Sequence, residues 1–233
     1  INISNSVTTI GEGAFRGCES LTNINIPNSV TTIGEGAFKD CNSLISINIP
    51  NSVTIIENCS FEDCESLTSI TIPSSVVTII GNPFCLWHGN LYNESKAFIY
   101  EDHVLFNRNK TTLIAYRAKE TSYTIPNSVT EIGRWTFHAC ESLQSIELPT
   151  SIHAISGRMF DRCTSLKSIT IPDSVTKIED VAFASCNSLE SITIPNSVTE
   201  IGSSAFIECE SLQNIKIPNG VTEISSYLFY KCT

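Results

Sequence analysis

The sequence has no long apolar run and little positive charge, and each shortage excludes a class of function. No apolar stretch approaches the ~20 residues that a helix needs to cross a bilayer, so no membrane insertion is expected. The 24 acidic residues outnumber the 14 basic ones, and the resulting net charge of -10 repels phosphate backbones and anionic headgroups. We therefore do not expect nucleic acid as a partner.

Motifs for catalysis are also missing. The sequence contains no nucleophile elbow, phosphate-binding loop, zinc-protease helix motif or dinucleotide fingerprint. The four histidines have no carboxylate or nucleophile at a motif spacing. We expect neither an enzyme nor a cofactor.

What the sequence does contain is a 23-residue repeat with the template I-P-x-S-V-T-x-I-G-x-x-A-F-x-x-C-x-S-L-x-x-I-x. A unit of this length cannot bury its own apolar side chains, whereas stacked copies can, so the period predicts a solenoid. The register breaks once, between Pro73 and Pro126, and then resumes. The phenylalanines recur at Phe15, Phe38, Phe61, Phe84, Phe137, Phe160, Phe183, Phe206 and Phe229.

Three segments of the template predict local structure. The stretch L-x-x-I-x-I, as at residues 44–49, alternates apolar and polar positions and predicts a half-buried strand. Proline ends this strand because it has no N–H for the ladder. V-T-x-I predicts a second short extended run, and A-F-x-x-C predicts a 3₁₀ or irregular turn.

This succession of L-x-x-I-x-I-P, S-V-T-x-I-G and A-F-x-x-C resembles the BspA-like, or treponemal-type, leucine-rich repeats. The resemblance covers nearly the whole chain outside residues 85–120. It implies a leucine-rich-repeat solenoid, mostly β with short irregular turns, that coils to the right and curves around a concave parallel sheet. We expect one solenoid domain over 1–233, a fragment of a longer chain, with regular repeats at 1–84 and 121–233 and an irregular insertion at about 85–120.

The same resemblance implies a cell-surface or secreted protein, often concerned with adhesion, whose partner is a protein or an extracellular-matrix ligand. The first residues carry no signal peptide, so this location rests on the family alone. Two alternatives remain open. One is a cytoplasmic scaffold for protein interactions, and the other is a structural spacer without a ligand of its own.

Eight of the ten cysteines share one template position and predict a column of buried thiols, because rungs near 4.8 Å do not suit disulfide geometry. Cys59 and Cys85 lie off this column. They could form a disulfide, or join Cys64 and His88 at a zinc ion; the second needs Cys64 to leave the core, so no metal is expected. The column is Cys18, Cys41, Cys64, Cys140, Cys163, Cys186, Cys209 and Cys232.

The break in the template predicts an antiparallel meander from the runs 97–100, 103–106 and 111–117. Its aromatic and basic side chains are the kinds that dominate binding interfaces, although the rings could instead pack a local core. The candidate binding residues here are Trp87, His88, Tyr92, Tyr100, His103 and Arg108.

The outward positions of the L-x-x-I-x-I strand form a second candidate surface, polar and almost uncharged. Solenoids bind through such extended faces, although Ser, Thr and Asn also serve solubility alone. Neither end of the chain has an evident cap, so self-association through the ends is expected as well. The candidate residues on this face are Asn48, Thr71, Glu147, Thr170, Thr193 and Lys216.

Overall fold

The computed structural model describes residues 1–232, which divide into two compact units, Ile1–Asn109 and a second that begins at Lys110. Strands and turns make up all the regular structure of the described residues, without a helix. Each repeat is one coil of a solenoid, and below a coil is named after its phenylalanine. The predicted solenoid of leucine-rich repeats is confirmed.

In the first unit, the two extended segments of the template form two parallel ladders. The V-T-x-I segment supplies one of them, in which Thr9 pairs with Thr32 and each strand is offset by one repeat from the next. Its strands are β1 (Thr9–Ile10), β3 (Thr32–Ile33), β5 (Ile55–Ile56) and β7 (Thr78–Ile79). The L-x-x-I-x-I segment supplies β2 (Asn23–Asn25), β4 (Ser46–Asn48), β6 (Ser69–Ile72) and β8 (Asn90–Asn93), with β2 paired to β4 and β6 to β8.

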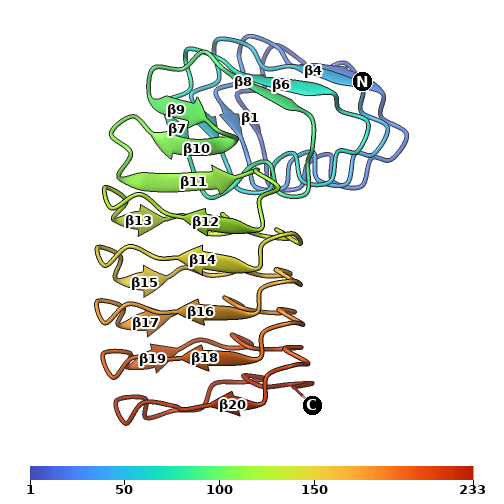
Figure 1. The fold of residues 1–233 in the computed structure, drawn as a ribbon. Coiled ribbons are helices and arrows are strands. Elements are labelled where there is room, and N and C mark those ends of the chain that lie inside the picture. The colour runs from blue at the N-terminus through green and yellow to red at the C-terminus, as the bar shows by residue number, and fades with distance from the viewer. Residues whose placement is uncertain (233) are drawn as a thin grey trace. The chain divides into compact units, whose positions relative to one another are not determined.

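The second unit repeats this arrangement, and its rungs lie one below another in Figure 1. One set of strands comprises β11 (Thr112–Tyr116), β13 (Glu131–Ile132), β15 (Ala154–Ile155), β17 (Lys177–Ile178) and β19 (Glu200–Ile201). The other comprises β12 (Ser122–Thr124), β14 (Ser145–Glu147), β16 (Ser168–Thr170), β18 (Ser191–Thr193) and β20 (Asn214–Ile215). All pairings within this unit are parallel, because each strand meets its own copy in the next coil.

The A-F-x-x-C segment forms an irregular turn that wraps around its phenylalanine, as the template predicts. The residues two before and two after the ring take left-handed backbone angles in nearly every coil; in the Phe38 coil they are Gly36 (φ 58°) and Asp40 (φ 61°). Glycine adopts this conformation without cost, but most coils place another residue there, such as Val181 (φ 61°). The ring between them is buried: Phe38, Phe61, Phe137, Phe160, Phe183 and Phe206 are 0 % exposed.

The ladder cysteines are thiols, as predicted; five of the eight are buried, while Cys18, Cys140 and Cys232 are partly buried. Six of the eight thiols donate to the carbonyl oxygen of the phenylalanine in the preceding coil, as Cys64 Sγ does to Phe38 (3.1 Å) and Cys186 Sγ to Phe160 (3.1 Å). Burial raises the pKa of Cys41 to about 11 and that of Cys64 to about 12. The column therefore packs as a row of small neutral side chains.

The regular ladders reach into the stretch where the template is lost. Strand β8 pairs in parallel with β6 at an offset of 21 residues, so that Leu91 takes the buried position of Ile70. Leu113 of β11 likewise pairs with Ile132. Between them lies a hairpin of β9 (Phe98–Glu101) and β10 (Val104–Asn107), with antiparallel pairing as the meander predicts. Both offsets differ from the 23 residues of the repeat, so the sequence template does not reveal these two strands.

Candidate binding surfaces

The outward side of the L-x-x-I-x-I strands is called the sheet face below. In the first unit it carries a column of exposed side chains. Asn2, Asn25 and Asn48 follow one another on successive coils, and Thr71 stands directly beside Tyr92. The side chains between these positions, such as Ile24 and Ile70, point into the core. Tyr92 is 56 % exposed, so an aromatic ring lies on this polar face where sequence reasoning assigned it to the insertion.

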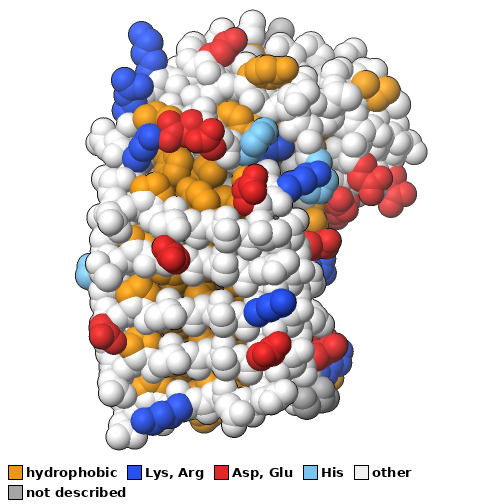
Figure 2. Space-filling view, in the orientation of Figure 1, with side chains coloured by type: hydrophobic (Ala, Val, Ile, Leu, Met, Phe, Trp, Pro, Cys, Tyr) orange, Lys and Arg blue, Asp and Glu red, His pale blue; other side chains and the backbone are white. Residues whose placement is uncertain are grey.

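The sheet face of the second unit continues the same chemistry. Glu147, Thr170, Thr193 and Lys216 are all exposed, and Glu147 accepts a hydrogen bond from the hydroxyl of Thr124 (3.0 Å). Figure 2 shows few and scattered charged side chains over these rungs. The six residues expected on the sheet face therefore all reach solvent, and the surface offers hydroxyl and amide groups in a regular array.

Trp87 does not belong to a binding surface, and the expectation that it contacts a partner is wrong. Its side chain is only 3 % exposed, and its indole N–H donates to the carbonyl oxygen of Leu67 (2.7 Å). The ring lies 5.8 Å from that of Phe84. Trp87 stands three residues after Phe84, where the template has cysteine, so the indole replaces a core thiol.

The other residues proposed in the insertion are divided between two places. His88 is exposed beside the buried Trp87. On the hairpin, the half-buried ring of Tyr100 meets that of His103 edge-on at 6.4 Å, and its hydroxyl lies 3.4 Å from His103 Nδ1. His103 and Arg108 are exposed. The hairpin thus presents a small set of accessible groups rather than an aromatic platform.

Sequence reasoning missed a cluster on the turns of the second unit. The guanidinium of Arg158 lies over the Trp135 ring (4.7 Å) and bonds to Asp161 (3.1 Å between Nη1 and Oδ2). His138 Nδ1 is 3.4 Å from the same carboxylate, and its ring is 4.6 Å from Trp135. The signal was present, since both His138 and Asp161 directly follow a ladder phenylalanine and the repeat places them side by side. These side chains come from the Phe137 coil and the Phe160 coil and contact one another, so the cluster joins the two coils.

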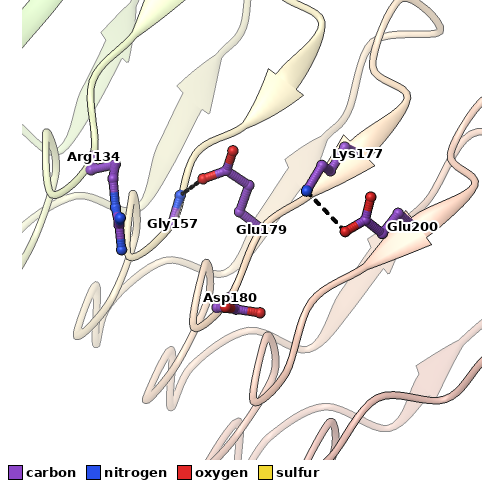
Figure 3. A pocket seen from close by; sticks show the side chains of 6 residues that line it. All are labelled: Arg134, Gly157, Lys177, Glu179, Asp180 and Glu200. Carbon is purple, nitrogen blue, oxygen red and sulfur yellow. Dashed lines mark hydrogen bonds and ion pairs between the residues drawn. The ribbon is translucent and has the colours of Figure 1, made fainter.

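A polar hollow of about 280 Å³ lies near this cluster, between the V-T-x-I strands and the turns (Figure 3). Its carboxylates are already engaged: Glu179 accepts the Gly157 N–H (2.8 Å), Glu200 pairs with Lys177 (2.8 Å) and Asp180 accepts the Ser203 N–H (2.7 Å). The hydrogen bond and charge of Glu200 raise the pKa of Lys177, which keeps the lysine protonated. The hollow is therefore a structural seam between coils.

The residues considered for a zinc ion, Cys59, Cys64, Cys85 and His88, are not arranged as metal ligands. Cys64 points into the core and donates to Phe38, as the column predicts. Within residues 1–232, no group of three or more His, Cys, Asp or Glu side chains is placed to hold a metal ion. Nor do these residues form a helix with the length and hydrophobicity to cross a membrane.

Comparison with known proteins decides the family. The model of the BspA type leucine rich repeat region matches residues 1–91 and 115–233 in six copies. The chain belongs to this family. The unmatched gap, residues 92–114, contains the β9–β10 hairpin, so the family's repeats surround the hairpin on both sides. A search of curated proteins finds no match.

Solved structures of bacterial leucine-rich-repeat proteins share the fold. A leucine rich cell surface protein from Faecalibacterium prausnitzii is 34 % identical with a TM-score of 0.70, over 88 % of this chain and 62 % of that one. The pneumococcal vaccine antigen PcpA is 25 % identical with a TM-score of 0.79, over 97 % of this chain and 58 % of that one. The chain thus spans about three fifths of the length of both proteins.

Proposed function

We propose that the chain is a non-enzymatic binding module of a cell-surface adhesin or ligand-binding protein, and that it engages a protein or extracellular-matrix ligand through its sheet face. The observation that carries this proposal is the column of exposed side chains that repeats on every rung, with Tyr92 beside Thr71. Solenoids characteristically bind along such extended surfaces rather than in deep pockets. No cofactor is needed for this function.

The composition of the face suggests what kind of ligand it takes. Hydroxyl and amide side chains at the spacing of a parallel ladder can hydrogen-bond an extended chain at several points. Tyr92 adds a large ring with a polar tip, the type of residue that anchors protein interfaces. Since charged groups are few here, affinity should depend only weakly on salt.

The proposed location is supported by relatives rather than by the chain itself. The similar Faecalibacterium protein is described as a cell surface protein, which favours a surface or secreted location for this one. A cytoplasmic scaffold would use the same face, and its buried thiol column would suit a reducing compartment. Binding to matrix proteins discriminates between the two, because an intracellular scaffold has no reason to recognise them.

The test is saturable binding of the 233-residue protein to a panel of extracellular-matrix proteins and glycans. Tyr92→Ala and Thr170→Lys each remove or obstruct part of the sheet face and should weaken Kd by about tenfold or more. Thr176→Lys is the matched control, since this exposed threonine lies in the V-T-x-I segment, outside the sheet strands. Circular dichroism confirms that the variants are folded.

The outcomes separate the surfaces. Loss of binding in Tyr92→Ala supports the sheet face of the first unit and loss in Thr170→Lys that of the second, provided that Thr176→Lys is unaffected. Loss only in His103→Ala and Arg108→Ala moves the site to the hairpin. A folded protein that binds nothing on the panel contradicts the adhesin proposal and favours a scaffold or a spacer.

A further inference from the structure

Two cysteines outside the thiol column lie against each other in the first unit. Cys59 stands two residues before Phe61, and Cys85 directly follows Phe84 in the next coil. Their sulfur atoms are 3.7 Å apart, and both side chains are buried, at 4 % and 1 % exposure. A disulfide needs about 2.05 Å between sulfurs, so a small adjustment of two side chains would suffice.

The backbone already holds this pair in place. The Cys59 N–H donates to Asn82 (2.9 Å) and the Asp63 N–H donates to Cys85 (3.2 Å), so hydrogen bonds between the coils flank the two sulfurs on either side.

The ladder cysteines differ from this pair in orientation. Their thiols donate along the solenoid to phenylalanine carbonyls; Cys64, the nearest in sequence to Cys59, donates to Phe38 (3.1 Å). The Cys59 thiol instead points toward the Cys85 sulfur (3.7 Å), while the Cys85 thiol also lies 3.2 Å from the carbonyl oxygen of Asn82 in its own coil.

We propose that Cys59 and Cys85 form an intramolecular disulfide when the chain folds in the presence of a small disulfide oxidant. One thiolate attacks the oxidant to give a mixed disulfide and releases one reduced thiol. The second cysteine then displaces the other half. Two S–H bonds are lost and one S–S bond forms, while the two electrons and two protons leave in two molecules of reduced oxidant.

The bond would staple the Phe61 coil to the Phe84 coil, the last regular coil before the β9–β10 hairpin. It closes a loop of 26 residues, which restricts the unfolded chain and should raise Tm by on the order of 5–10 °C. Because both sulfurs are buried, the bond forms during folding and is shielded from reductants afterwards.

The experiment refolds the 233-residue protein with oxidised and reduced glutathione, alkylates the remaining thiols and digests without reduction. Cleavage after glutamate separates the relevant cysteines, with Cys59 in 58–62, Cys64 in 63–65 and Cys85 in 66–94. The expected product is a linked pair of 58–62 and 66–94 that disappears on reduction. The Tm of this oxidised protein should exceed that of the protein refolded in reductant.

Variants supply the control. Cys59→Ser and Cys85→Ser should abolish the linked peptide, and their Tm should not depend on the redox buffer. Cys18→Ser, which changes a half-buried ladder thiol, should keep both the link and the Tm shift. Full alkylation of Cys59 and Cys85 in the folded wild-type protein, a stable glutathione adduct on either, or a link from Cys64 would each overturn the proposal.

Discussion

The ring of Phe183 lies parallel to the ring of Phe206, with centroids 5.4 Å apart and planes only 2° apart. The same relation runs through each unit, at 5.3 Å between Phe15 and Phe38 and again between Phe160 and Phe183. Each ring inside the stack therefore contacts the coil before it and the coil after it. A single side chain holds three coils in register.

Truncation of one stacked ring should destabilise its unit strongly. For Phe183→Ala we expect a loss of about 3–5 kcal/mol in the free energy of unfolding, because both ring contacts disappear and a cavity remains. Urea denaturation followed by circular dichroism measures the change. Thr193→Ala changes an exposed side chain on the sheet face and should change stability by no more than about 0.5 kcal/mol. Equal effects of the two variants would contradict the stacking account.

A glycine substitution should stabilise the chain at Val181. This β-branched residue has a left-handed backbone (φ 61°), which costs about 1–3 kcal/mol relative to an unstrained conformation. Val181→Gly relieves that strain but loses some contact area and adds unfolded-state entropy, so we expect a net gain of about 1 kcal/mol. The comparison is Val198→Gly, at a fully buried valine without positive φ, which should be clearly destabilising. A loss of stability in Val181→Gly would show that packing outweighs strain there.

Alkaline pH should unfold the protein through its thiol column. Burial raises the pKa of Cys64 from 9.0 to about 12, so the unfolded state loses its proton first as the pH rises. The stability that this thiol contributes is complete below pH 9 and is lost between pH 9 and about 12, at up to about 1.4 kcal/mol per pH unit. Urea midpoints at pH 8, 9.5 and 10.5 measure the slope. Cys64→Ala should be less stable at pH 8 yet show a shallower decline; an unchanged slope would contradict the assignment.

Self-association of the 233-residue chain remains a prediction. The last described coil exposes residues at positions that are buried elsewhere: Ile224 is 61 % exposed, whereas its equivalents Ile178 and Ile201 are 0 % and 2 % exposed. We expect light scattering to show a mass that grows with concentration, and Ile224→Lys to reduce it, because a charge on an apolar face opposes stacking of coils. A monomer at all concentrations would refute this prediction.

The sequence predicts the features that follow from the 23-residue period and misses those where the period or the usual residue type is lost. The Phe, Cys and Ile columns were predictable because 23-residue spacing alone stacks identical residues. Tyr92 was misplaced because its strand is offset by 21 residues, which breaks the apparent register while the ladder continues. Trp87 looked like a surface aromatic because its template position was unexpected for an indole. The repeat places Trp135 and Arg158 at the same template position in successive coils, but the residue type at this position varies, so no column of like residues marks their contact.

Successive coils are joined by backbone hydrogen bonds, such as the one from the Phe38 N–H to the Ser60 carbonyl oxygen (2.9 Å). A pulling force applied to the two ends of one unit therefore opens these bonds like a zipper, a single rung at a time, instead of shearing a whole sheet at once. Each coil that peels away releases 23 residues, or roughly 75–80 Å of extended chain. Such a module would yield to tension in small, repeated steps while the rungs beyond the break remain folded.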